Sequence, residues 1–209
     1  MVLGKIKYLT RLYFHKRKWR KLNQHNYTQI NNLTDIKKIS VGKGTYGTLN
    51  IVDYSPKTGK SKVKIGSYCS IADDVTFLLG GGHCLHSLST YPFQHFLFNK
   101  EESLDKGDII ISDDVWIGTQ VTIMSGVRVG RGAVIGAKAL VNKDIPDYAI
   151  AVGIPAKVIK YRFEPALIKE LKKFDFSKLN RVTITDNINL LSENLTENML
   201  SELEKKLNE

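Results

Sequence analysis

Aliphatic residues recur at every sixth position between Ile111 and Val141. Written in sixes, this stretch reads ISDDVW, IGTQVT, IMSGVR, VGRGAV, IGAKAL and VNKDIP, with an apolar residue at every first and fifth place. A helix cannot use this period, because each residue turns by about 100° and the apolar column spreads around every face. Short strands joined by corners can use it. Three strands per coil place every sixth side chain inside a triangular prism.

The same period appears earlier in the chain, at Ile65, Ile71 and Phe77, and more weakly from Val41. Glycine recurs at the second place of the later hexads, where we expect a tight turn that a Cβ would oppose. These glycines are Gly118, Gly130 and Gly136. The pattern predicts an all-β core, a left-handed parallel β-helix built from hexapeptide repeats.

The period breaks between Phe77 and Ile111, because a separation of 34 residues is not a multiple of six. We therefore expect residues 79–108 to leave the prism as an extruded loop. A loop this long in a compact solenoid is usually functional or disordered. The aromatic residues of STYPFQHF argue against disorder. We interpret the loop as an ordered arm that covers a surface of another subunit.

The period is also absent at both ends, which divides the chain into three predicted parts. Residues 1–38 form a basic N-terminal helix or arm, residues 39–160 the β-helix, and residues 161–209 a C-terminal helical cap. Apolar residues at helical spacing predict short α-helices at both termini. We expect the C-terminal helices to cover the unpaired strand edges at the open end of the prism.

The composition is that of an ordinary globular domain, with 209 residues of which 42% are hydrophobic and 25% charged. Its two cysteines, Cys69 and Cys84, are too few for a disulfide framework. No stretch approaches the roughly 20 apolar residues that span a bilayer, and the N-terminal segment lacks the apolar core of a secretory signal. We therefore expect a cytoplasmic protein.

The net charge of +10 is concentrated at the N-terminus, where residues 1–21 hold eight basic residues and no acidic ones. The rest of the chain is nearly neutral, which argues against a nucleic-acid-binding domain. Two interpretations of this segment stay open. Either it contacts an anionic polymer or the anionic inner face of a membrane as a peripheral anchor, or it is a solvated helix packed on its own trimer.

Four motifs carry a resemblance to a known family. They are GGGH, which ends at His83, STYPF at residues 89–93, DDVWIG at residues 113–118 and GIPAKVI at residues 153–159. Together with the hexads, they resemble the hexapeptide-repeat acyltransferases of the xenobiotic acetyltransferase branch over about residues 16–165. That branch includes the type B chloramphenicol and streptogramin acetyltransferases and many polysaccharide O-acetyltransferases.

Within this branch, the segments WRKLN, HN and GKGTYG are more similar to the O-acetyltransferases of surface-polysaccharide gene sets. The chain departs from the antibiotic-modifying enzymes at residues 174–177, which read FDFS where a paired-tryptophan helix is common. The resemblance implies acetyl-CoA as co-substrate, direct transfer to a sugar hydroxyl, and a homotrimer with active sites between subunits. Acetylation of an antibiotic, or of an amino sugar at nitrogen, stays open as the alternative.

Acetyl transfer requires a base that takes the proton of the attacking hydroxyl, and histidine has a suitable pKa. His83 matches the family's catalytic histidine, so we expect it to be the general base. His86 is the substitute, and we expect His95 to be a packing residue of the arm. Cys84 as an acyl-enzyme nucleophile is a rival that the implied direct transfer argues against. A metal site is disfavoured, because adjacent residues of an extended chain point in opposite directions.

The corners of the coils offer a groove for the pantetheine arm of acetyl-CoA, and the last coils offer cations for its phosphates. By resemblance, we expect the acetyl-CoA site to include Trp116, Gly118, Gly136, Ala137, Lys138, Lys157 and Arg162. Ordinary surface charge is the alternative for each of these cations. The expected acceptor-binding residues are Tyr46, His86, Ser89 and Tyr91.

Overall fold

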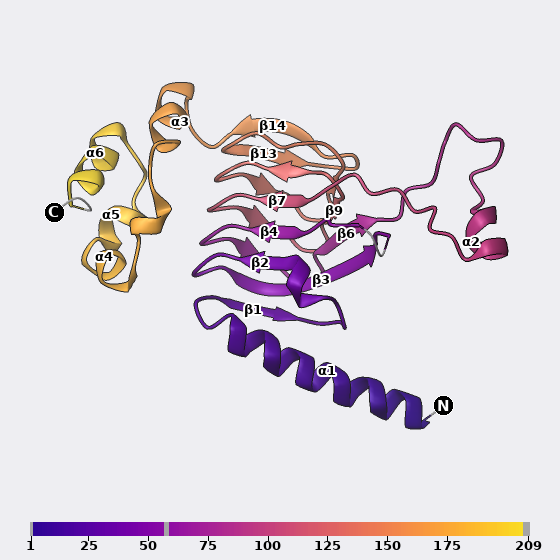
Figure 1. Cartoon of the computed structure of the whole chain (residues 1–209). Coiled ribbons are helices and arrows are strands. Elements are labelled where there is room, and N and C mark those ends of the chain that lie inside the picture. Colours follow the sequence, from indigo (N-terminus) through magenta and orange to yellow (C-terminus); the bar gives the residue numbers. More distant parts are fainter. Residues whose placement is uncertain (1, 57–58, 207–209) are drawn as a thin grey trace. The chain divides into compact units, whose positions relative to one another are not determined.

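The computed structural model describes residues 2–56 and 59–206 of the chain (Figure 1). The chain divides into two compact units, Met1–Lys160 and Tyr161–Glu209. The first unit contains an N-terminal helix, a stack of short strands and an arm that leaves the stack (Figure 1). The second unit is mainly helical.

The strands of the first unit form three parallel ladders, one for each face of a prism. One ladder contains β1 (Tyr27–Ile30), the start of β3 (Tyr46–Tyr54), β5 (Ser70–Ile71), β8 (Trp116–Ile117), β11 (Val134–Ile135) and β13 (Ala149–Val152). The next contains β2 (Ile39–Val41), β4 (Val63–Ile65), β7 (Ile109–Ile111) and β10 (Arg128–Val129). The third contains the end of β3, β6 (Thr76–Gly80), β9 (Thr122–Met124) and β12 (Leu140–Val141). At the edge of the first ladder, β14 (Lys157–Tyr161) follows β13.

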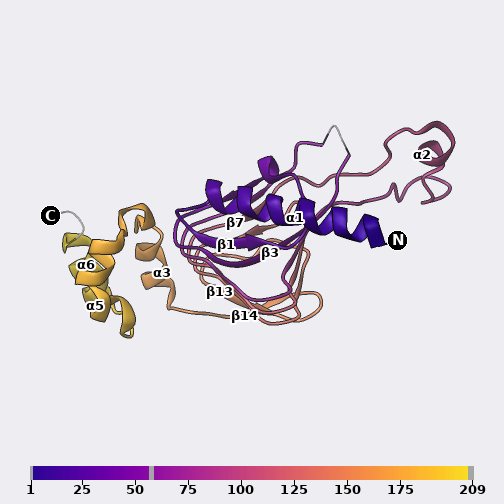
Figure 2. The same cartoon turned by 90° about the horizontal axis from the view of Figure 1, so that it is seen from below.

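Three hexads complete one coil, so residues eighteen apart lie side by side on successive coils. The pairings that show this are Ile111 with Val129, Ile117 with Ile135 and Ile123 with Val141. All twelve residues at the first and fifth places of the six later hexads are at most 4% exposed. This burial confirms the predicted register and the parallel β-helix. Seen along the stack, successive coils overlie one another (Figure 2).

The structure corrects the role that we predicted for the second-place glycines. None of Gly118, Gly130 and Gly136 has a positive φ. A Cβ on Gly118 would instead lie 2.7 Å from the backbone nitrogen of Ala137 on the next coil, so glycine is required there by the close approach of the coils. The left-handed conformation that turns each corner occurs at the fourth place, with φ between 57° and 81°. The residues there are Gly44, Tyr68, Asp74, Asp114, Gln120, Gly126, Gly132 and Lys138. After the last hexad, VNKDIP, the left-handed residue is Tyr148 in place of the fourth-place Asp144.

The N-terminal helix α1 (Val2–Leu22) has 21 residues, so the prediction of short terminal helices was wrong at this end. The coils also begin earlier than residue 39, because β1 already pairs with β3 and buries Thr28 and Ile30 completely. A 3-10 helix, η1 (Ile36–Lys38), connects β1 to β2. In the described ranges, no helix is both long and apolar enough to cross a bilayer.

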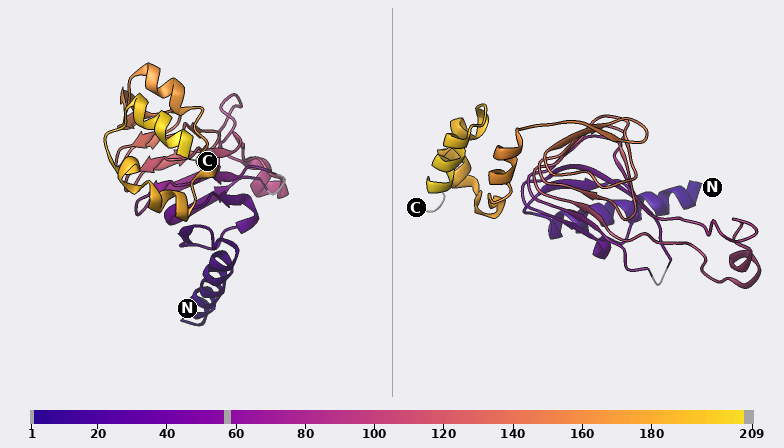
Figure 3. Two further views of the ribbon diagram at one scale, coloured as in Figure 1. Left: turned by 90° about the vertical axis from the view of Figure 1, so that its left-hand side faces the viewer. Right: turned by 90° about the horizontal axis from the view of Figure 1, so that it is seen from above.

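The arm leaves the prism after Gly80 and returns at Ile109. An antiparallel bridge between Gly82 and Leu104 closes its neck, with backbone hydrogen bonds of 3.1 Å and 2.8 Å. Beyond the neck, the arm extends away from the coils and carries the short helix α2 (Phe93–Phe98) (Figures 1 and 3). The neck therefore fixes both ends of the arm at one corner of the prism.

The second unit contains the helices α3 (Pro165–Leu171), α4 (Arg181–Asp186), α5 (Ile188–Ser192) and α6 (Glu197–Lys206) and a 3-10 helix, η2 (Phe176–Lys178). Its buried apolar side chains include Leu171, Phe174, Leu179, Leu200 and Leu203. Leu171 lies on α3, and Leu200 and Leu203 lie on α6, so these two helices each bury apolar side chains, as amphipathic helices do. A function of this unit as a cap on the prism stays a prediction.

Candidate active site

His83 lies at the neck of the arm, directly after Gly81 and Gly82. Its Nδ1 atom is 2.6 Å from the backbone oxygen of Thr90. A carbonyl oxygen can only accept a hydrogen bond, so Nδ1 carries the proton and donates it. In the neutral imidazole, the other ring nitrogen, Nε2, is then the acceptor. The backbone of the STYPF segment thus selects the tautomer of His83 that a general base requires.

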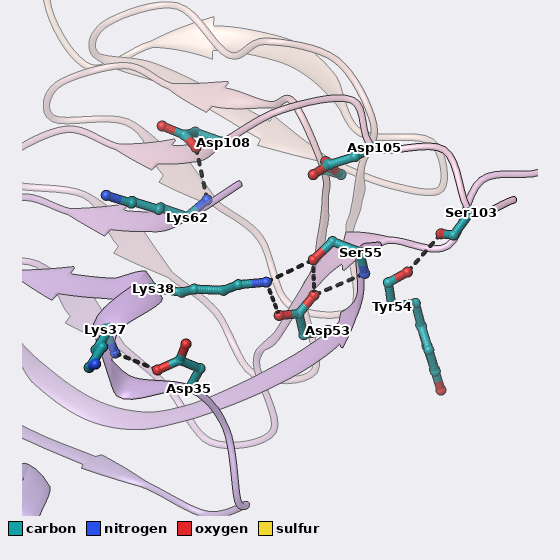
Figure 4. Close-up of polar contacts among 11 residues, drawn as sticks. Asp35, Lys37, Lys38, Asp53, Tyr54, Ser55, Lys62, Ser103, Asp105 and Asp108 are labelled. Carbon is teal, nitrogen blue, oxygen red and sulfur yellow. Dashed lines mark hydrogen bonds and ion pairs between the residues drawn. The ribbon is translucent and has the colours of Figure 1, made fainter. Parts of the chain in front are cut away.

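The His83 side chain lines a pocket of about 570 Å³ between the neck of the arm and the end of β3. The lining residues are Tyr54, Ser55, Pro56, Gly81, His83, Pro92, His95, Glu101, Glu102 and Ser103. The hydroxyl of Ser103 donates to the carbonyl of Tyr54 at 2.7 Å and accepts from the amide of Gly81 at 3.2 Å (Figure 4). These bonds tie the returning part of the arm to β3 and hold the pocket walls together.

His95 is a pocket residue that the sequence did not reveal as one. Its ring packs edge-on against Phe96, with centroids 5.2 Å apart, which agrees with the expected packing role. The same residue also lines the pocket of His83, and its backbone amide donates to Glu102 at 2.9 Å. The fold of the arm brings His95 to the pocket of His83. No regular spacing in the sequence indicates that these two residues line the same pocket.

The predicted acceptor residues do not line this pocket. Tyr91 stacks on Phe96 within the arm, with ring centroids 5.2 Å apart. The Ser89 hydroxyl accepts a hydrogen bond from the Tyr91 amide at 3.1 Å. His86 is exposed, and Tyr46 is an exposed residue at the start of β3. A role for these four residues in acceptor binding stays a prediction.

The two thiols have different environments. Burial raises the pKa of Cys69 to about 12, so this thiol stays protonated at neutral pH. Cys84 is exposed, and hydrogen bonds from the backbone of His86 and from Ser87 lower its pKa. These partners of Cys84 do not include the ring of His83, which a nucleophile activated by that histidine would need. Among the described residues, no three His, Cys, Asp or Glu side chains form a group that could hold a metal ion.

Five of the predicted acetyl-CoA residues lie on two successive coils. Trp116 on β8 is 58% exposed and pairs with Val134 on β11. Each strand leads directly into a corner, and the corners hold the other four: Gly118, Gly136, Ala137 and Lys138. Lys157 is exposed on β14. Arg162 belongs to the second unit, where its guanidinium lies 5.1 Å from the centroid of the Phe163 ring.

The chain matches known proteins in sequence over its coils. The family model Bacterial transferase hexapeptide (six repeats) matches residues 108–143. A probable macrolide acetyltransferase of Lysinibacillus sphaericus is 41% identical over 139 residues, which cover 63% of this chain and 77% of that protein. The chain belongs to the hexapeptide-repeat acetyltransferases. This confirms the resemblance that the four motifs and the hexads carry.

The acetyltransferase is also similar to a chloramphenicol acetyltransferase of Agrobacterium fabrum, at 43% identity over 128 residues. That match covers 56% of this chain and 61% of the relative, so it spans less than two thirds of the relative's length. Among solved structures, a maltose O-acetyltransferase of Clostridium difficile 630 has a TM-score of 0.52 at 29% identity. It covers 66% of this chain and 67% of that one.

Aspartates of the acetyltransferase fasten its arm and the neighbouring coil (Figure 4). Asp108, where the arm re-enters the prism, accepts hydrogen bonds from the Lys64 ammonium at 2.7 Å and from the Lys62 amide at 2.8 Å. The bond from Lys64 is the main cause that lowers the pKa of Asp108. For Asp53, burial raises the pKa, but hydrogen bonds from Lys38 and Ser55 outweigh burial and lower it overall.

We expect acid to weaken this fastening at Asp108. Because its folded-state pKa lies below the ordinary value of 3.8, its contribution to stability is present above pH 3.8 and is lost as the pH falls toward the lowered value. In Asp108→Asn, urea unfolding between about pH 5 and 3 should therefore show a shallower loss of stability than in wild type. Glu193→Gln, an exposed residue of the second unit, is the control. An unchanged acid dependence in Asp108→Asn would contradict the prediction.

Proposed function

We propose that the protein transfers the acetyl group of acetyl-CoA to a hydroxyl of a sugar in a bacterial surface polysaccharide or its precursor. The observation that carries this proposal is the hydrogen bond from His83 Nδ1 to Thr90, which leaves Nε2 as the acceptor of the neutral ring, in a residue that lines a pocket. The family supplies the reaction class, because its members are acetyltransferases. Acetyl-CoA is the co-substrate that this class requires.

His83 acts as the general base of a direct transfer. As the acceptor oxygen attacks the thioester carbonyl, its proton moves to Nε2 of His83. The new C–O bond forms and the C–S bond breaks, so that the acetyl ester and the coenzyme thiolate are the products. The imidazolium then returns its proton to the thiolate, which leaves the protein unchanged. The bond from Nδ1 to Thr90 keeps the ring in place through both proton transfers.

The corner formed by Trp116, Gly118, Gly136, Ala137 and Lys138 is the proposed site for the coenzyme's arm. These residues lie on or directly after β8 and β11, two paired strands of successive coils. Their backbone amides and carbonyls are therefore available to bind the amides of the coenzyme's arm. Lys157, on β14, is the proposed contact for its phosphates. A phosphate contact by Arg162, which belongs to the second unit, stays a prediction. The coils take the left-handed sense that the hexads and the family imply.

A homotrimer is part of the proposal, because the arm exposes apolar side chains that another surface must cover. These side chains include Leu85, Leu88, Phe93, Phe96, Leu97 and Phe98, each at least 54% exposed. A single copy leaves them in water, whereas a second copy beside the neck can bury them. The arm then closes over an active site shared by two subunits.

A polar acceptor fits the pocket lining. Glu101 and Glu102 supply carboxylates, Ser55 and Ser103 supply hydroxyls, and Tyr54 supplies an aromatic ring. Such groups bind the hydroxyls and the apolar faces of a sugar ring. A sugar acceptor also agrees with the similarity to the solved structure that is named as a maltose O-acetyltransferase. The second candidate is an antibiotic acceptor, which the chloramphenicol and macrolide acetyltransferases among the relatives favour.

An acceptor panel separates the two candidates. Release of the coenzyme thiol from acetyl-CoA is measured with bacterial capsule and lipopolysaccharide sugars, and in parallel with chloramphenicol and a virginiamycin-type streptogramin. We expect a higher kcat/KM on at least one sugar than on either antibiotic. Turnover confined to an antibiotic would replace the proposed acceptor class and would leave the reaction unchanged.

A further inference from the structure

Helix α1 combines a dense positive charge with exposed apolar side chains. It carries no acidic residue, and its basic residues are Lys5, Lys7, Arg11, Lys16, Arg17, Lys18, Arg20 and Lys21. Large apolar side chains on the same helix are more than half exposed to solvent. They are Leu3 at 84%, Ile6 at 54%, Leu9 at 52%, Tyr13 at 56%, Phe14 at 62% and Leu22 at 59%. Exposed apolar side chains in such a group mark an interaction surface.

The last turns of α1 are fastened to the coils. Trp19 is 1% exposed, and its Nε1 atom donates to the Thr28 carbonyl at 3.2 Å. The Arg20 guanidinium donates to the Thr28 carbonyl at 2.8 Å and to the Asn26 carbonyl at 2.7 Å. Except for Leu22, the apolar residues of α1 that are more than half exposed all precede this anchor. The N-terminal part of α1 reaches beyond the first coil (Figure 1). The anchor therefore holds the C-terminal end of α1 on the first coil and leaves these apolar side chains exposed.

We propose that α1 binds the surface of an anionic lipid membrane. Its basic side chains lie against lipid phosphates, and Ile6, Leu9 and Tyr13 enter the boundary between headgroups and acyl chains. These three residues are at helical spacing and share one side of the helix. Their neighbours Lys16 and Arg17 can extend long stems along that apolar side and place their charges at the headgroups.

Exposed apolar side chains distinguish a lipid surface from a soluble polyanion as the partner. A polyanion in water is bound by charge and gives no reason for Leu3, Ile6 and Leu9 to be exposed. A membrane surface uses both the charge and the apolar side chains. In a rotational trimer whose axis runs along the stack, three copies of α1 would lie at the same end. One flat surface could then bind all three.

Vesicle flotation with the full-length protein tests the role of charge. The wild-type chain is mixed with phosphatidylglycerol–phosphatidylcholine vesicles and with vesicles of phosphatidylcholine alone. We expect binding to the anionic vesicles that weakens as salt is added. The variant Lys5→Gln, Lys16→Gln, Arg17→Gln removes exposed charges that flank the apolar side of α1. It should bind at least about 30-fold more weakly, since each basic residue near an anionic surface contributes about a five-fold increase in partitioning.

A matched control removes the same number of charges elsewhere. Lys169→Gln, Lys172→Gln, Lys173→Gln lowers the net charge equally, but these exposed lysines belong to the second unit. We expect this variant to bind the anionic vesicles within about two-fold of wild type, because its substitutions leave every charge of α1, the proposed binding helix, in place. Equal loss of binding in the two triple variants would overturn the proposal, since it would make net charge alone the cause.

A second variant tests whether the apolar side chains insert. Ile6→Ser, Leu9→Ser should lose vesicle binding but should keep wild-type binding to dextran sulfate, a soluble polyanion. Both residues are exposed, so the thermal unfolding midpoint should not change. Wild-type vesicle binding by this variant would overturn the proposal. The proposal would also be overturned if the unsubstituted protein bound dextran sulfate but not the anionic vesicles. A smaller oligomer in Ile6→Ser, Leu9→Ser would overturn it too, because it would assign the apolar side to another copy of the chain.

Discussion

Replacing His83 with alanine should lower kcat by about 100-fold or more, while the affinity for acetyl-CoA stays close to that of wild type. The reason is that Nε2 of His83 is the proposed proton acceptor, whereas the proposed coenzyme contacts lie on the coils at β8 and β11. Steady-state kinetics with the acceptor identified by the panel measures kcat. Equilibrium binding of the coenzyme measures the affinity separately.

His86→Ala is the informative comparison for this result. His86 is three residues from His83 in sequence, but it does not line the pocket. Its loss should therefore reduce kcat far less than the loss of His83. An equal or larger reduction would transfer the role of general base to His86. Turnover retained in His83→Ala would remove His83 from that role.

Replacing Ile123 with aspartate should prevent the chain from folding. Ile123 is completely buried, and it pairs with Phe77 on one neighbouring coil and Val141 on the other. A carboxylate at this place would lie inside the prism without a partner, which costs several kcal/mol in an interior of low dielectric constant. That cost is comparable to the total stability of about 5–15 kcal/mol that a domain has. Circular dichroism and gel filtration measure the outcome.

Thr122→Asp is the matched control, because it introduces the same charge one position earlier on β9. Successive residues of a strand point to opposite sides, so this carboxylate would point away from the prism. We expect the unfolding free energy of Thr122→Asp to stay within about 1 kcal/mol of wild type. A folded, active Ile123→Asp would contradict the register in which the hexads are assigned to the coils.

The coils could be predicted from the sequence because each hexad repeats a local pattern. Every place in the interior is filled by an apolar residue at fixed spacing, from Ile65 to Ile145, with one interruption. The first coil could not be predicted from this pattern. Its strand β1 buries Thr28 as well as Ile30, and a polar threonine does not continue the apolar pattern of the hexads. The conformation of the corners could not be predicted either. Glycine is the residue expected in the left-handed conformation, but Gln120 and Lys138 also adopt it.

The site could be predicted in part. A motif located His83, because the glycine run directly precedes it and the STYPF segment begins six residues after it. The partner of its ring is a backbone carbonyl, that of Thr90, and any residue type supplies a carbonyl. The pocket joins Tyr54 at the end of β3 to Glu102 on the returning part of the arm. No local pattern relates these two positions, since the long arm alone brings them together.

The most direct test of the central claim is a mass-spectrometric comparison of surface glycans from the source cell. Three strains are compared: one with the wild-type chain, one without the gene, and one complemented with the His83→Ala variant. We predict a sugar that carries an acetyl increment in the first strain and lacks it in the other two. Glycan acetylation that is the same in all three strains would contradict the account.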